Sequence, residues 1–213
     1  MTRIKICGIT NGDDAIAAVD LGADALGFIF AESPRRTEPR QAAQVISRLP
    51  PLVTTVGVFF NQELSAIQSA MKESGCQVVQ LHGEEPDYYV EALAQWPVVK
   101  ALRVRAAQDL ERLVPYGAAR AFLLDTYVEG RPGGTGQAFD WSIAAGAHRF
   151  KKPVILSGGL SSKNVAAALA VVKPHAVDAS SGVESAPGKK DREKMRRFVA
   201  VVRAFDARSA EGP

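Results

Sequence analysis

The stretch Pro153-Val154-Ile155-Leu156-Ser157-Gly158-Gly159-Leu160 decides between the two folds that the pattern of this chain allows. A short apolar run followed by a glycine pair is typical of a buried parallel strand that leads into an anion-binding loop. In an open doubly wound sheet the glycine-rich loop usually follows the first strand, but here that strand leads into Cys7-Gly8-Ile9-Thr10-Asn11, without a GxGxxG pattern. In a (βα)8 barrel the phosphate loops follow the seventh and eighth strands. The late position of this stretch therefore favours the barrel.

Short apolar runs that end in polar or glycine residues recur along the whole chain. They recur every 20 to 30 residues or so, which is roughly the length of one strand, one helix and two short loops. Eight such units predict a single-domain (βα)8 barrel over residues 1–207, with a frayed tail over residues 208–213. The predicted strands are Ile4–Cys7, Ala25–Phe30, Thr55–Phe59, Val78–His82, Val98–Ala101, Ala121–Asp125, Pro153–Ser157 and Ala176–Asp178.

Apolar residues at helical spacing fill the gaps between those strands. Pro39 lies near the first turn of one helix and Gly75 follows the end of another, where these residue types are favoured. We expect Asp140 to cap the sixth helix, and Ser161 or Ser162 to cap the seventh. The predicted helices are Asp13–Leu21, Pro39–Leu49, Leu64–Ser74, Pro86–Gln95, Ala107–Val114, Trp141–Ala147, Asn164–Val172 and Arg192–Phe205.

Composition and charge narrow the functional class. The chain has 213 residues, of which 46% are hydrophobic, as expected for a globular enzyme. A net charge of +3 is too small to predict a nucleic-acid partner, and no apolar run predicts a signal peptide or a membrane span. The two cysteines do not indicate a disulfide framework, so we expect a cytoplasmic protein. We interpret the basic run Lys189–Arg197, which also contains acidic residues, as a solvated helix face.

Two glycine-rich loops predict a phosphate site. Gly158 and Gly159 follow the seventh predicted strand, and Ser180, Ser181 and Gly182 follow the eighth. Glycine lets the backbone approach an anion closely, successive N–H groups form an anion-binding concavity, and a helix N-terminus adds a favourable dipole. Such loops on neighbouring strands predict a phosphate monoester site. The alternative is that both are simply tight turns.

Polar residues at the carboxyl ends of the predicted strands indicate catalysis in the barrel mouth. Cys7 would be a base or nucleophile if its neighbours lower its pKa, and Asp125 in an apolar surround would stay protonated as an acid. One base and one acid suit an isomerisation that moves protons. The alternative for Cys7 is that it is simply a small buried apolar residue, which is how we interpret Cys76. The alternative for Asp125 is that it is a capping or turn residue. We expect the following strand-end residues to converge: Cys7, His82, Asp125, Ser157 and Asp178.

Other charged and flexible positions extend this predicted site. Arg35 and Arg36 follow the second strand, and an arginine there could hold a second anionic group; the alternative is a pair of surface arginines. His82 could line the pocket, but the histidines are too widely spaced to predict a metal site. We interpret the glycine-rich segment Gly130–Gly136 as an active-site loop, with an ordinary surface loop as the alternative.

These motifs, taken in order, closely resemble the phosphoribosylanthranilate isomerase family. The resemblance extends from the first strand to the last helix, and the number and order of the matching pieces make it specific. The matching pieces are Lys5–Thr10, Gly27–Phe30 with Ser33–Arg36, Val56–Phe59 with Asn61, Gln80–Gly83, Leu124–Asp125, Gly133–Gly136 with Phe139–Trp141, Leu156–Leu160 with Asn164–Val165, and Val177–Asp178 with Ser180–Glu184.

The resemblance implies a (βα)8 barrel without a cofactor that acts in tryptophan biosynthesis, and we expect a monomer or a homodimer. Its reaction would be the Amadori rearrangement of N-(5-phosphoribosyl)anthranilate to 1-(2-carboxyphenylamino)-1-deoxyribulose 5-phosphate. By the same resemblance, Asp125 is the general acid at the ring oxygen, Cys7 is the general base at C2′, and the glycine loops bind the phosphate. Arg36 would hold the anthranilate carboxylate, and we expect Arg35 to point towards solvent. His82 and Asp178 complete the predicted set as substrate-binding residues.

Two rival functions follow from the same residues. One is another sugar-phosphate isomerase barrel, or an enzyme with dual histidine- and tryptophan-pathway activity. The related histidine-pathway enzyme relies on two aspartates, one of them at the first strand, so Cys7 in that place favours the single activity. The other rival is a binding barrel that has lost catalysis, and the presence of both Cys7 and Asp125 argues against it.

Overall fold

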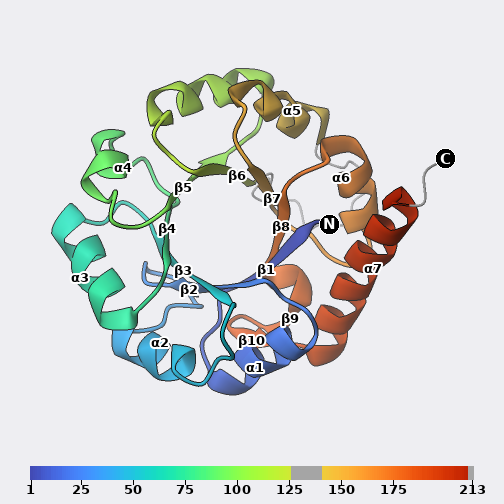
Figure 1. Cartoon of the computed structure of the whole chain (residues 1–213), viewed down its shortest axis with the longest axis horizontal. Coiled ribbons are helices and arrows are strands. Elements are labelled where there is room, and N and C mark those ends of the chain that lie inside the picture. The colour runs from blue at the N-terminus through green and yellow to red at the C-terminus, as the bar shows by residue number, and fades with distance from the viewer. Residues whose placement is uncertain (126–140, 211–213) are drawn as a thin grey trace.

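The structure, a computed structural model, describes residues 1–125 and 141–210. Eight parallel strands close into a barrel in sequence order, with β8 paired to β1, and helices surround the ring (Figure 1). This architecture confirms the predicted (βα)8 barrel. The barrel strands are β1 (Arg3–Cys7), β2 (Ala25–Ile29), β3 (Thr54–Phe59), β4 (Val78–Leu81), β5 (Val98–Arg103), β6 (Ala121–Asp125), β7 (Val154–Ser157) and β8 (Ala176–Ala179).

The helical layer follows the predicted segments, with shifts at the ends. Its elements are α1 (Gly12–Asp20), α2 (Pro39–Ile46), α3 (Leu64–Ser74), α4 (Tyr88–Ala92), η1 (Ala107–Tyr116), α5 (Trp141–Ala145), η2 (Gly146–Phe150), α6 (Val165–Val172), η3 (Ser181–Val183) and α7 (Arg192–Ala210), where η denotes a 3₁₀ helix. Helix α7 continues to Ala210, so the first three residues of the expected frayed tail are helical. Among these helices, none is long and apolar enough to cross a membrane.

Helix ends are set by local hydrogen bonds. The side chain of Asn11 accepts the N–H of Asp14 and caps α1, and Gly75 ends α3 in the left-handed conformation, with φ 72°. Ser161 makes the hydrogen bond expected of a cap, because its hydroxyl accepts the N–H of Lys163 at 3.3 Å, although α6 itself begins later, after Asn164. The side chain of Asn164 in turn accepts the N–H of Ser161 at 2.8 Å. The predicted cap Asp140 and the Gly130–Gly136 segment lie outside the described residues.

Strand alternation separates an outer core from an inner one. Along β1, Ile4 and Ile6 belong to the large apolar cluster formed with the helices. Cys7 belongs instead to a smaller cluster with Val56 and Val58 of β3. Since side chains two apart share a face of a strand, Lys5 points with Cys7 into the barrel. The same alternation directs polar side chains at the strand ends into the mouth.

A small antiparallel hairpin after β8 was not predicted. It consists of β9 (Glu184–Ala186) and β10 (Lys189–Lys190), and it lies near α1 (Figure 1). The Lys190 side chain is fully buried, and its backbone N–H donates to Asp14. The interpretation of the whole basic run as a solvated helix face is therefore wrong at Lys190, because this residue belongs to a strand that packs against the end of β1 and the first turn of α1.

Candidate active site

Two side-chain pairs lie at the carboxyl ends of β4, β6, β7 and β8. The Nε2 atom of His82 lies 3.4 Å from Oδ2 of Asp125, and the amide of Gln80 lies 2.9 Å from Nδ1 of the same ring. When that amide donates to Nδ1, the ring proton is on Nε2 and points to Asp125. The hydroxyl of Ser157 donates to Oδ2 of Asp178 at 3.2 Å. Asp125 and Ser157 are register partners, so the two pairs adjoin.

A buried lysine links Asp178 to Cys7. The Nζ atom of Lys5 lies 3.0 Å from Oδ1 of Asp178, and both side chains are almost completely buried. Gly27 of β2 makes room beside them: a Cβ atom at this glycine would lie 2.7 Å from Sγ of Cys7 and 3.2 Å from Cε of Lys5. The predicted base and the predicted substrate-binding Asp178 therefore share one neighbour, Lys5, inside the barrel.

The electrostatic surroundings of Cys7 differ from the sequence-based expectation. Burial raises the pKa of the thiol, and the negative charge of Asp178 raises it further. The positive charges of Lys5 and Lys190 lower the pKa, but the net shift is upward from the usual value of 9.0. The thiol is therefore neutral near pH 7 in the free protein. Burial disfavours the ammonium of Lys5, yet attraction to Asp178 and Cys7 raises the pKa of Lys5 above its usual value. Lys5 is therefore protonated.

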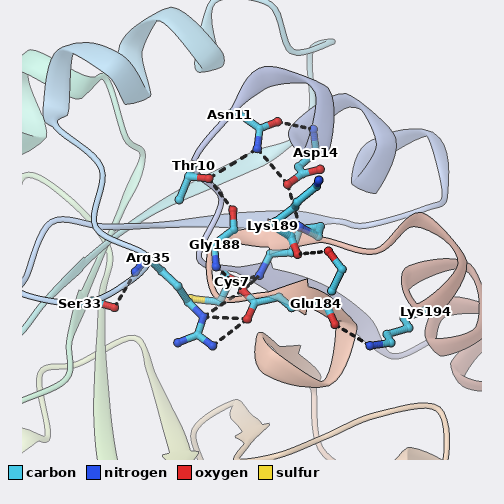
Figure 2. A network of polar contacts seen from close by, with 12 residues as sticks. Cys7, Thr10, Asn11, Asp14, Ser33, Arg35, Glu184, Gly188, Lys189 and Lys194 are labelled. Atoms are coloured by element: carbon cyan, nitrogen blue, oxygen red, sulfur yellow. Dashed lines mark hydrogen bonds and ion pairs between the residues drawn. The ribbon is translucent and has the colours of Figure 1, made fainter.

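A second buried network fixes the backbone of Cys7. Figure 2 shows the carboxylate of Glu184 in β9 facing the guanidinium of Arg35. Oε2 of Glu184 lies 2.7 Å from Nη2 of Arg35, and Oε1 lies 2.7 Å from Nζ of Lys190. The Lys190 ammonium also donates to the carbonyl oxygen of Cys7 at 2.5 Å. The hairpin after β8 thus holds both the end of β1 and the loop after β2.

The two adjacent arginines of that loop point in different directions. The expectation that Arg35 points towards solvent is wrong, because its guanidinium forms a fork with the buried Glu184 carboxylate. Gly8, with φ 79°, allows this path: a Cβ there would lie 2.7 Å from Cδ of Arg35. The Arg36 side chain is 53% exposed and pairs with Glu38 at 3.0 Å, so its guanidinium remains accessible.

The two predicted phosphate loops lie in contact. Gly158 and Gly159 adopt positive φ angles of 100° and 65° after β7. A Cβ atom at Gly182, in the loop after β8, would lie only 2.0 Å from the carbonyl oxygen of Leu160. Only glycine permits this approach, so the backbones of both loops form one surface beside the mouth.

A cavity of about 340 Å³ lies on the β4–β5 side of the mouth. His82, Leu102, Arg103 and Tyr116 contribute to its lining, whereas Cys7 and Asp178 do not. The cavity therefore adjoins the predicted site through His82. In residues 1–125 and 141–210, no cluster of three or more His, Cys, Asp or Glu side chains has an arrangement suited to a metal ion.

Lys5, Glu184 and Lys190 were given no role by the sequence. The available signal for Lys5 was its position two residues before Cys7 in a strand buried on both faces, which places both side chains on one face. For Lys190 the signal was hidden, because the residue stands in a charged run that precedes a helix.

Comparison with known proteins agrees with this architecture. Residues 4–201 match the family model of N-(5'phosphoribosyl)anthranilate (PRA) isomerase. The isomerase of Pelobacter propionicus is 49% identical over 95% of this chain and 96% of its own length. A crystal structure of phosphoribosyl anthranilate isomerase from Thermotoga maritima superposes with a TM-score of 0.90 at 42% identity, covering 96% of this chain and all of that one. Another structure of the isomerase, in complex with reduced 1-(o-carboxyphenylamino)-1-deoxyribulose 5-phosphate, gives a TM-score of 0.86 at 40% identity, with the same coverage. This chain therefore belongs to the N-(5'-phosphoribosyl)anthranilate isomerase family, the isomerases of tryptophan biosynthesis.

Proposed function

We propose that this barrel rearranges N-(5-phosphoribosyl)anthranilate by general acid–base catalysis, with Asp125 as the acid and Cys7 as the base. The observation that supports these roles most directly is their placement. Both side chains stand at the carboxyl ends of strands, β6 and β1, and the intervening β7 and β8 contribute Ser157 and Asp178 between them. A relative with 40% identity binds a reduced form of the expected product, which supports the same phosphorylated substrate.

The proposed reaction moves two protons in sequence. Asp125 donates a proton to the ring oxygen as the C1′–O bond breaks, and the anilino nitrogen lone pair forms the iminium ion. The thiolate of Cys7, formed when the thiol releases its proton to solvent, then takes the proton from C2′, and the electrons of that C–H bond form the C1′=C2′ double bond of the enolamine. Tautomerisation adds a proton to C1′ and removes one from the C2′ hydroxyl, which gives the ketone. Asp125 then regains a proton from solvent and Cys7 releases one, which restores the reacting form of the enzyme. Both residues act at hydrogen-bonding distance from different sides of the sugar.

We assign the phosphate of the substrate to Gly158, Gly159, Ser180, Ser181 and Gly182. The close approach of Gly182 to Leu160 supports a single binding surface, and backbone N–H groups suit an anion there. His82 and Asp178 contact the sugar between the acid and the base in this arrangement.

We assign the anthranilate carboxylate to Arg36 rather than Arg35. Two nitrogens of Arg35 already bind Glu184, and withdrawing them would leave a buried carboxylate short of a partner. The partner of Arg36 is the exposed Glu38, so exchange of that carboxylate for the ligand costs little. We expect Arg36→Met to weaken binding of the carboxylated substrate by about 1.5–3 kcal/mol, the scale of a hydrogen bond to a charged group.

Steady-state kinetics on three variants test the acid and base roles. We expect Cys7→Ser and Asp125→Asn each to lower kcat by about 10²-fold or more, with KM changed little. Cys76→Ala is the matched control, because this other buried cysteine lies outside the mouth and should leave kcat unchanged. Near-normal turnover in Cys7→Ser or Asp125→Asn would remove that residue from the mechanism.

A further inference from the structure

Lys5 is buried deep inside the barrel, and the mechanism above gives it no role. Its side chain is 6% exposed, and that of its partner Asp178 is 5% exposed. Burial of a lysine costs free energy because the ammonium loses its hydration, so a buried lysine is expected to have a structural or functional role. The polar groups around Lys5 are those of the mouth: Asp178, which also accepts from Ser157, and the thiol of Cys7.

We propose that Lys5 is a positioning residue that supplies the counter-charge for the thiolate of Cys7. This inference rests on the proposed role of Cys7 as the base. In this arrangement Asp178 holds the ammonium at 3.0 Å, and alternation along β1 presents that ammonium on the same face as the thiol. Gly27 leaves the space in which Lys5 and Cys7 lie side by side.

The other charged groups near Cys7 are less suited to stabilise its thiolate. From β8 comes Asp178, whose negative charge opposes a thiolate. From β10 comes Lys190, and from the loop after β2 comes Arg35, but Glu184 of β9 binds both. The Lys190 ammonium also donates to the carbonyl oxygen of Cys7. Lys5 is therefore the cation that shares the inner face of β1 with the sulfur and lies beside it next to Gly27.

The charge balance of the proton transfer fits this role. Before the step, the ammonium of Lys5 lies beside two anions, the thiolate and the Asp178 carboxylate. The thiolate takes the C2′ proton and becomes a neutral thiol, and the carboxylate then remains as the sole partner. Lys5 keeps all of its protons throughout, so the cycle needs no additional acid or base at this position.

A thiolate titration tests the proposal without depending on turnover. The background is Cys76→Ala, and ultraviolet absorbance of the thiolate is followed against pH, with Cys7→Ser in the same background subtracted. We expect Lys5→Met to move the Cys7 titration upward by about one pH unit or more, a tenfold loss of thiolate at a given pH. Lys100→Met is the matched control, because Lys100 also pairs with a buried carboxylate but lies away from the thiol; its titration should match the background.

A double variant separates loss of the counter-charge from exposure of Asp178. The double variant Lys5→Met with Asp178→Asn is compared with Asp178→Asn alone, because Asp178 itself opposes a thiolate. A titration that is higher in the double variant than in Asp178→Asn must come from the missing ammonium. Equal titrations in these two variants would overturn the proposal, as would an unchanged titration in Lys5→Met alone. Lys5→Arg keeps the charge and should retain most of the native titration, even if Lys5→Met folds poorly.

Kinetics distinguish failure of this proposal from failure of the base assignment. Normal turnover in Cys7→Ser would overturn the role of Cys7 as base, whatever the titration shows. A shifted titration together with a kcat loss of about tenfold in Lys5→Met, at unchanged KM, supports the counter-charge role.

Discussion

Two buried lysine–carboxylate pairs lie at opposite sides of this barrel, and their surroundings differ. Lys5 and Asp178 lie inside the barrel at 3.0 Å, next to the thiol of Cys7. Lys100 of β5 and Glu85 lie 2.7 Å apart. Val99 and Ala101 belong to the barrel interior, so Lys100 between them faces the helical layer, where its ammonium lies 4.9 Å above the Tyr116 ring.

The outer pair is satisfied largely by backbone groups. Glu85 accepts the N–H groups of Asn61 and Gly83, and Lys100 donates to the carbonyl oxygen of Gly83 at 2.5 Å. These bonds tie together the loops after β3 and β4, which fixes their shape. In the inner pair, Asp178 instead accepts the hydroxyl of Ser157, and Lys5 lies beside Cys7 at Gly27. A lysine–carboxylate pair therefore stabilises loops on the outer side of β5, whereas the other pair lies next to the proposed base inside the barrel.

Removal of Lys100 should have the largest effect on stability. Lys100→Met leaves the buried Glu85 carboxylate without its cation, a loss expected to cost about 3–5 kcal/mol of unfolding free energy. Urea unfolding measures this loss, and kcat of the folded variant should stay within about twofold of the native value, because no proposed catalytic group contacts Lys100. A large fall in kcat without loss of stability would break the distinction between the two pairs.

A pair of glycine substitutions compares the inside of the barrel with the outside. A Cβ at Gly27 would lie 2.7 Å from Sγ of Cys7, whereas a Cβ at Gly57 would lie 2.9 Å from Sδ of Met71 in the outer core. Both alanine variants should lose about 1–3 kcal/mol through overpacking. Only Gly27→Ala should also lower kcat, by about tenfold, because it displaces the base. Equal kcat values in the two variants would contradict the position assigned to Cys7.

The Glu184 network should make stability depend on pH. Burial acts to raise the pKa of Glu184, but Arg35 and Lys190 hold it below its usual value of 4.5. A depressed pKa in the folded state adds stability that is present above pH 4.5 and is lost as the pH falls through the folded-state pKa. Unfolding free energies measured against pH should therefore fall less steeply below pH 4.5 for Glu184→Gln than for the native chain. Parallel curves would show that the ion pairs do not contribute in this way.

The smallest effect is expected at Tyr116. Its hydroxyl donates to the carbonyl oxygen of Glu85 at 2.6 Å, so Tyr116→Phe should cost about 0.5–1.5 kcal/mol. The ring and its contact with Lys100 remain, and kcat should not change. A kcat loss comparable with that of Gly27→Ala would show that the β4–β5 side takes part in the chemistry.

Strand order and the strand-end residues were predictable from the sequence because barrel strands are buried on both faces and end in polar residues. Asp125 ends β6 as predicted, and Leu64–Ser74 forms α3 with the predicted bounds. These features depend on local patterns, namely apolar runs, helical spacing and a glycine stop.

Features that depend on tertiary contacts were not predictable. The inward path of Arg35 depends on the space at Gly8 and on Glu184, which is distant in sequence. Burial of Lys190 depends on the carbonyl oxygen of Cys7, 183 positions away. The raised pKa of Cys7 likewise depends on burial, which its own segment does not specify.

The pH dependence of kcat/KM tests most directly whether Lys5 stabilises the thiolate of Cys7 while Lys100 only stabilises the loops after β3 and β4. The reacting form of the enzyme has Asp125 protonated and Cys7 ionised, and burial raises the pKa of Cys7, so kcat/KM is limited by the small thiolate fraction. The account predicts that the kcat/KM profile of Lys5→Met lies about tenfold below the native one from neutral pH up to the ionisation of Cys7, and that the Lys100→Met profile coincides with the native one. A Lys5→Met profile that coincides with the native one would contradict it.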